Sequence, residues 1–206
     1  FSLKSVVLSG EKPDSKASSD GESVKLLGYK WNTELDILYP GTSELNLNRK
    51  KKGVRKANPF PINSKEDAER LLSQVGLTRR IIISKIAEIY DPMELWEPIK
   101  LQLKLQATEL NSIPWDKSLN PDSQVKWKKI LAKFTRYGEL SAKRFPFSEN
   151  IDTTETFRLV CLSDAGKHAG GAAIYMSKRC KDGSWSVALL CSKSKLMKGT
   201  IPRNEL

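Results

Sequence analysis

The chain has 206 residues, enough for one large domain or two small ones with a buried core, and 39% of them are apolar. Lys and Arg number 35 against 24 Asp and Glu, so the net charge of +11 favours a polyanionic partner such as nucleic acid over a small neutral substrate. The uncharged apolar runs are too short to cross a bilayer, so no membrane partner is expected. With one His, the residues Cys161, Cys180 and Cys191 have neither the number nor the spacing of a zinc site.

The first 60 residues are predicted to form a small hairpin followed by a basic loop. Two extended segments, Val24 to Trp31 and Asp36 to Tyr39, flank the turn-forming residues Asn-Thr-Glu-Leu. This hairpin would display Gly28-Tyr29-Lys30-Trp31 near its tip. Arg49 to Lys56 contains six basic residues and no acid, which suits either a solvated loop or a phosphate contact.

Two helices are predicted between Ser64 and Pro92. Ser64 can cap the first helix, and the acidic residues Glu66 and Asp67 suit its first turn. The second helix follows Gly76 and is expected to end at Asp91-Pro92, because the residue before a proline avoids the helical region.

Two further helices are predicted between Pro98 and Gly138. The segment from Pro98 to Leu110 alternates like a strand, but nearly all of its residues are good helix formers, so a helix is favoured. The last helix begins at the capping residue Asn120, runs through Tyr137 and ends at Gly138.

The character of the sequence changes after Pro146. Three strands are predicted over residues 157–162, 172–176 and 186–191, with Lys181-Asp182-Gly183 as the turn between the last two. A helix is expected to begin at the very end of the chain. These patterns predict an α+β protein with a boundary near residues 147–156.

Two carboxylates of this last region are candidate ligands of a metal ion. Asp164 is expected at the end of the first strand, and Glu205 in the first turn of the final helix. Hard oxygen ligands of this kind suit Mg²⁺, although a turn Asp and a helix-start Glu are also ordinary structural residues. The sequence around Asp164 is also similar to the active loop of aspartic peptidases, but Ala165 stands where a hydroxyl residue is expected. His168 is interpreted as a surface residue, and Trp31 is the only Trp considered for base stacking.

Four sequence blocks together resemble the polyproteins of the BEL/Pao class of LTR retrotransposons, in a segment that bears the name Pao retrotransposon peptidase. The resemblance spans nearly the whole chain, and its position is similar to the end of reverse transcriptase running into RNase H. The blocks are Leu26 to Asn32, Ile83 to Pro92, Leu162 to Ala165 and Thr200 to Leu206.

The resemblance implies specific roles for residues in each block. Tyr29, Lys30 and Trp31 would belong to a hairpin that grips the primer strand. The helix from Thr78 to Tyr90 would be the thumb helix that follows the duplex, with phosphate contacts from its basic residues Arg79, Arg80 and Lys85. Asp164 resembles the first RNase H carboxylate and Glu205 the second, and together they would hold Mg²⁺, which activates water in the complete domain.

The expected architecture therefore has three parts. Residues 1–60 form the hairpin and basic loop, residues 61–147 a helical thumb or connection region, and residues 156–206 the three-stranded first half of an RNase H-like fold. The family usually has Gly where this chain has Glu94, so the turn there is expected to differ.

The expected function is that of a Pol polyprotein segment which links reverse transcriptase to RNase H and binds RNA–DNA hybrid or template-primer duplex. The implied partner motifs would lie before Phe1 and after Leu206, so the chain alone is expected to be inactive. A cytoplasmic retroelement particle, or the nucleus, is the expected location. Two alternatives remain open, namely an inactive or domesticated remnant that acts only in binding, and an aspartic-type peptidase.

Overall fold

The structure is a computed structural model that describes residues 7–13, 22–41, 45–48, 56–133, 139–145, 147, 151–152, 154 and 156–197. Contacts divide the chain into two units. The sheet unit comprises residues 1–38, 91–105 and 142–206, and the helical unit comprises residues 39–90 and 106–141. The division into three consecutive segments stays a prediction. Within the described residues, no helix is both long and apolar enough to span a membrane.

The sheet unit contains a small antiparallel sheet with the strand order β1-β2-β3-β4. Its strands are β1 (Ser23–Leu26), β2 (Tyr29–Asn32), β3 (Ile37–Tyr39) and β4 (Ala142–Lys143). The single strand predicted from Val24 to Trp31 is wrong, because the chain reverses at Leu27 and Gly28. Their φ angles of +50° and +89° are both positive, as a tight two-residue hairpin turn requires.

The helical unit contains α1 (Lys65–Ser73), α2 (Arg79–Ala87) and α4 (Pro121–Ala132). The predicted caps are confirmed, since Ser64 forms a capping box with Asp67 and Asn120 accepts a hydrogen bond from the first turn of α4. The core of this unit includes the fully buried side chains of Trp127 and Ile82. The predicted extension of α4 to Tyr137 lies outside the described residues.

The helix α2 ends earlier than its sequence predicts. Its last residue is Ala87, and Glu88 is its C-cap, so the chain leaves the helix before Asp91-Pro92. The next helix is α3 (Glu97–Ala107), followed by one turn of 3₁₀-helix, η1 (Thr108–Leu110). This confirms helix over strand for the segment that begins at Pro98.

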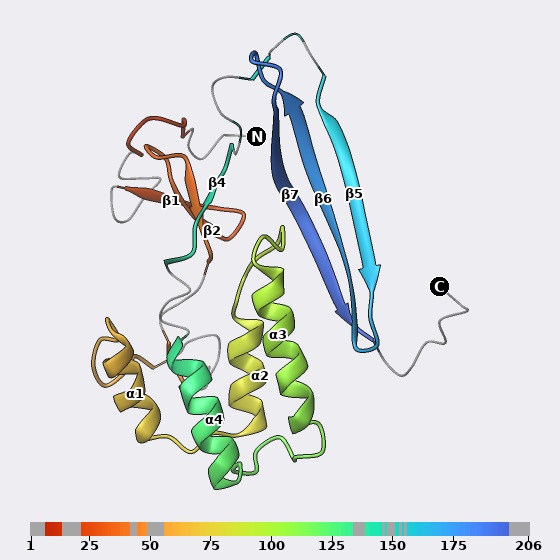
Figure 1. Ribbon diagram of the computed structural model, residues 1–206. Coiled ribbons are helices and arrows are strands. Elements are labelled where there is room, and N and C mark those ends of the chain that lie inside the picture. The colour runs from red at the N-terminus through yellow and green to blue at the C-terminus, as the bar shows by residue number, and fades with distance from the viewer. Residues whose placement is uncertain are drawn as a thin grey trace, which may run out of the picture. The chain divides into compact units, whose positions relative to one another are not determined.

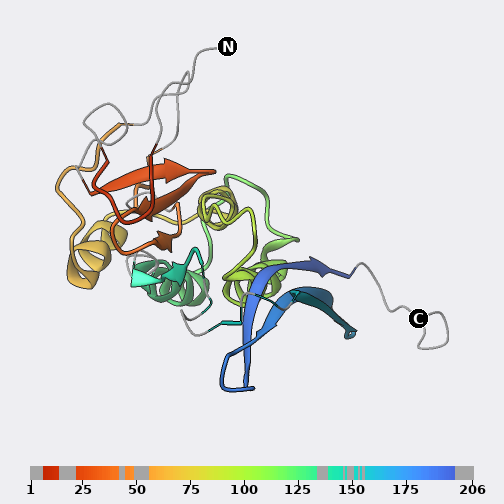
Figure 2. The ribbon, with the colours of Figure 1, turned by 90° about the horizontal axis from the view of Figure 1, so that it is seen from above.

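A second antiparallel sheet in the sheet unit has the strand order β5-β6-β7 (Figures 1 and 2). Its strands are β5 (Arg158–Ala165), β6 (Ala169–Arg179) and β7 (Trp185–Leu196). All three are longer than predicted, and the turn between β6 and β7 contains Gly183 with a φ of +87°. Every residue of β5 is exposed, so Ser163 and Asp164 can continue the strand beyond Leu162 without the free-energy cost of burying a polar side chain.

Candidate functional site

Asp164 lies inside β5 rather than after it. In the register of the sheet it is opposite Gly171 of β6, and Gly171 is opposite Ser194 of β7. Cross-strand partners share a face, so Asp164 lies on the same face of the sheet as Ser194. The Oδ1 atom of Asp164 accepts a hydrogen bond from the Ala165 amide at 2.8 Å. Its Oδ2 atom accepts none from the described residues.

The Asp164 side chain lines a groove of about 590 Å³ in the sheet unit. The groove is formed by the ends of β5, β6 and β7 together with the first residues of α3. Gly171, which is opposite Asp164, and its neighbour Gly170 line the groove and bring no side chains in front of the carboxylate. The carboxylate is therefore accessible to a ligand.

Three lysines belong to the strands and the turn at this end of the sheet. Lys167 lies in the turn from β5 to β6, and Lys195 is opposite Gly170 in the register. Both are exposed, and neither has a partner among the described residues. Lys193 is 77% exposed and forms an ion pair with Glu94. Sequence reasoning missed Lys193 and Lys195 because it ended the third strand at Cys191, although the alternation of Ser and Lys after Cys191 was a signal that the strand continues.

A second carboxylate at the groove, that of Glu97, is already engaged. Lys104 donates to its Oε1 atom at 2.6 Å, and the Ser194 hydroxyl donates to the same oxygen. The Nζ atom of Lys100 lies 3.5 Å from the Oε2 atom. Burial raises the pKa of Glu97, but the hydrogen bonds from Lys104 and Ser194 lower it more, so the net shift is downward.

The described residues do not by themselves complete a metal site. Among them, no group of three or more His, Cys, Asp or Glu side chains could hold a cation. Asp164 supplies one carboxylate, which suits Mg²⁺ only as part of a larger ligand set. The other predicted ligand, Glu205, lies outside the described residues.

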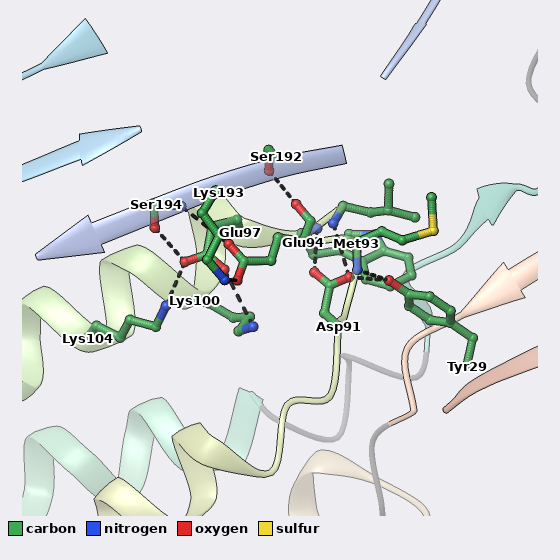
Figure 3. A network of polar contacts seen from close by, with 12 residues as sticks. Tyr29, Asp91, Met93, Glu94, Glu97, Lys100, Lys104, Ser192, Lys193 and Ser194 are labelled. Atoms are coloured by element: carbon green, nitrogen blue, oxygen red, sulfur yellow. Dashed lines mark hydrogen bonds and ion pairs between the residues drawn. The ribbon is translucent and has the colours of Figure 1, made fainter. Parts of the chain in front are cut away.

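Figure 3 shows how Tyr29 and Asp91 anchor the segment that precedes α3. The Asp91 carboxylate accepts hydrogen bonds from the Tyr29 hydroxyl at 2.7 Å and from the amides of Leu95 and Trp96 at 3.0 and 2.8 Å. Tyr29 is only 1% exposed, and Trp31 is buried in the same apolar cluster. Of the predicted primer-grip residues Tyr29, Lys30 and Trp31, only Lys30 is exposed.

Glu94 connects the same segment to β7 (Figure 3). Its carboxylate pairs with Lys193 and accepts a hydrogen bond from the Ser194 amide at 3.3 Å. Its φ is +52°, which lies in the left-handed region that favours Gly. At the position where the family pattern has Gly, this chain thus has the backbone conformation that Gly favours, together with a side chain that bonds to β7.

The three basic residues predicted to contact phosphates, Arg79, Arg80 and Lys85, all have partners inside the helical unit. Arg80 forms a two-point ion pair with Asp116 at 2.6 and 2.8 Å, and this hydrogen bonding raises its pKa. Arg79 donates to the Asn111 carbonyl at 2.9 Å. Lys85 is buried and donates to Glu88 at 2.6 Å. The phosphate role of these residues stays a prediction, because a phosphate would have to compete with these partners.

The family model of the Pao retrotransposon-like RNaseH-like domain matches residues 78–206, more than half of the chain. The match contains α2, α3, α4 and the three strands of the β5-β6-β7 sheet. Neither a search of curated proteins nor a search of solved structures gives a match. The match confirms the Pao resemblance and the RNase H-like fold class. The role of Asp164 stays a prediction.

Proposed function

This chain belongs to the family of Pao retrotransposon-like RNaseH-like domains, and from that premise we propose that it is a retroelement Pol segment that binds RNA–DNA hybrid or template-primer duplex. The observation that carries the proposal is the exposed carboxylate of Asp164 at a groove of the sheet unit, with the exposed Lys167 and Lys195 at the same end of the β5-β6-β7 sheet. A cytoplasmic retroelement particle, or the nucleus, is the proposed location. Reverse transcriptase would precede this segment in the parent polyprotein.

The phosphates of the duplex would be bound mainly by exposed lysines. Lys167 and Lys195 lie at the same end of the β5-β6-β7 sheet as Asp164, and Lys30 is exposed on β2. Tyr29 and Trp31 would act by holding Lys30 in place, since their rings are buried. Contacts of this kind fix the position of a duplex without reading its sequence, so binding is expected to be sensitive to salt and insensitive to base sequence.

Asp164 would be one ligand of a Mg²⁺ ion in the complete domain, with Glu205 as the second. Such an ion supplies an activated water and stabilises the leaving oxygen when the RNA strand is hydrolysed. The chain's own contribution is the open position of Asp164 opposite Gly171, which leaves room for a phosphate beside the carboxylate. The basic run over residues 49–55 lies outside the described residues, and its phosphate contact stays a prediction.

The test uses the parent polyprotein and measures two quantities, cleavage of labelled hybrid and hybrid affinity. Asp164→Asn and Glu205→Gln are each expected to abolish Mg²⁺-dependent cleavage and to leave the affinity within about a factor of two, because each removes one ligand charge. Asp182→Asn, which changes an exposed Asp in the turn from β6 to β7, is the matched control and is expected to cleave normally. Normal cleavage by both test variants would contradict the metal-site roles. Absence of hybrid binding by the unaltered polyprotein would contradict the proposal as a whole.

A further inference from the structure

Trp115 is a large apolar side chain that the helical unit leaves in solvent. It is 45% exposed, whereas Trp127 in the same unit is fully buried. It lines a groove of about 600 Å³ together with residues of α2, among them Arg80, Ile81 and Lys85. Removing the Trp115 indole from water would lower the free energy of the folded chain, so its exposure needs an explanation.

The exposed position of Trp115 is fixed by hydrogen bonds of its own loop. The Trp115 carbonyl accepts from the Arg80 amide at 3.0 Å, which satisfies an amide in the first turn of α2. Arg79 donates to the Ile113 carbonyl at 3.2 Å, and the Leu119 amide donates to the Leu77 carbonyl at 3.0 Å. The backbone that carries Trp115 is therefore held by hydrogen bonds on both sides of the residue, as a preorganised contact surface requires.

Positive charge is gathered around this ring. The guanidinium of Arg79 lies 4.3 Å from the centre of the Trp115 ring, and that of Arg80 lies 5.5 Å from it. Both arginines stand in the first turn of α2, which contains no acidic residue. The positive end of the helix dipole disfavours cations there, so the position of the two arginines beside Trp115 is electrostatically unfavourable for the helix.

Two guanidinium groups lie over the Trp115 ring, and 45% of the residue's surface is still exposed, so the part of the ring that they leave open matches the chemistry of an unpaired nucleic-acid base. Bases stack on exposed aromatic side chains regardless of sequence, and Arg contributes both stacking and charge. A duplex hides the faces of its bases, so only a single-stranded nucleotide can use the ring. Arg80 stays paired with Asp116, so the base rather than the phosphate is the part of the nucleotide that this groove would recognise.

We propose that the Trp115 groove binds an unpaired nucleotide of single-stranded DNA or RNA, with the base stacked on Trp115. This site is separate from the duplex contacts assigned to Lys30, Lys167 and Lys195, and it rests on the proposed function only in that the chain binds nucleic acid. Its geometric basis is the ring of Trp115, which is 45% exposed, lines a groove and has two guanidinium groups over it.

The experiment compares the affinity of the full chain for two probes at one salt concentration. The probes are a labelled oligodeoxyadenosine and an abasic strand of the same length, which has the same phosphates but no bases. The base-containing strand is expected to bind about 5- to 150-fold more tightly, the equivalent of 1–3 kcal/mol for one stacked base. Trp115→Ala is expected to bring this ratio close to one, and Trp115→Phe to retain most of it.

Trp185→Ala is the matched control, because Trp185 is also exposed, at 43%, and also has a guanidinium over its ring, that of Arg158. This variant is expected to keep the ratio. A ratio near one in the unaltered chain, a ratio that survives Trp115→Ala in a folded protein, or a ratio lost in Trp185→Ala would each overturn the inference. RNA–DNA hybrid titrated in the same samples distinguishes the Trp115 site from the proposed duplex binding. If the chain binds hybrid but binds the two single strands equally, only the Trp115 site is overturned.

Discussion

The helical unit and the β5-β6-β7 sheet use their charged residues in different ways. In the helical unit the side chains of Arg79, Arg80 and Lys85 all bond to groups of the same unit. At the Asp164 end of the sheet, Lys167 and Lys195 have no partner among the described residues. The difference teaches that a basic residue on a helix indicates nucleic-acid binding only after its internal partners are known.

The difference has a geometric origin. The arginines of α2 face the loop before α4, and the two-point pair of Arg80 with Asp116 suits the planar guanidinium. On the β5-β6-β7 sheet, every residue of β5 is exposed, and Lys167 and Lys195 have no partner among the described residues. The first arrangement orders a loop and presents Trp115, whereas the second leaves charge available for phosphates.

The largest expected effect concerns a buried acid that serves structure alone. Asp91→Ala is expected to lower the free energy of unfolding by about 3 kcal/mol, because the Tyr29 hydroxyl and the amides of Leu95 and Trp96 lose their acceptor. Asp164→Ala removes an exposed acid and is expected to change it by less than about 0.5 kcal/mol. Urea denaturation of both variants measures the contrast, and equal losses would remove the distinction between a structural and an available carboxylate.

The next effect tests which lysines bind phosphate. The double variant Lys167→Gln with Lys195→Gln is expected to reduce the slope of log affinity against log salt for RNA–DNA hybrid by roughly 1.8, about 0.9 for each lost contact. The control is Lys65→Gln with Lys126→Gln, which removes the same charge from two helical-unit lysines already paired with Glu69 and Glu109. An equal change in the control pair would show that only the net charge matters.

The third effect is a pH dependence of the sheet unit. The pKa of Glu97 lies below its ordinary value of 4.5, so its contribution to stability is complete above about pH 4.5 and is lost as the pH falls through the lowered pKa. Glu97→Gln is expected to lower the free energy of unfolding at neutral pH by on the order of 1 kcal/mol and to weaken its acid dependence. Urea denaturation between about pH 6 and pH 3 measures both. Identical acid dependence in the variant and the unaltered chain would exclude Glu97 as the titrating group.

The smallest effect concerns the backbone at Glu94. Both Glu94→Ala and Glu94→Gly remove the contacts to Lys193 and Ser194, but only Gly also relieves the positive φ. The glycine variant is therefore expected to be more stable than the alanine variant by about 1 kcal/mol. Thermal or urea denaturation of the pair measures this difference, and equal stabilities would mean that the left-handed conformation carries no cost.

Local signals in the sequence predicted most of the secondary structure. The caps Ser64 and Asn120 and the turn at Gly183 are found as expected, since each depends on residues a few positions apart. The break at Leu27-Gly28 was missed because Leu rarely adopts a positive φ, so an apolar run was interpreted as one strand.

The site was less predictable because its properties depend on distant residues. Arg80 and Asp116 are separated by 36 positions, and Tyr29 and Asp91 by 62, so no local pattern shows that these groups meet. Trp31 was considered for stacking because it lies on the predicted basic hairpin, yet Trp115 is the exposed ring of the two. Residue type and strand placement did identify Asp164 as an acid on the RNase H-like sheet, where it is exposed.

The most direct test of the central claim is a titration of the 206-residue chain with labelled RNA–DNA hybrid at several salt concentrations. If exposed lysines bind the phosphates of the duplex, the logarithm of the affinity falls linearly with the logarithm of the salt concentration, and hybrids of different sequence give the same line. An affinity that does not change with salt, or no binding at low salt, would contradict the claim.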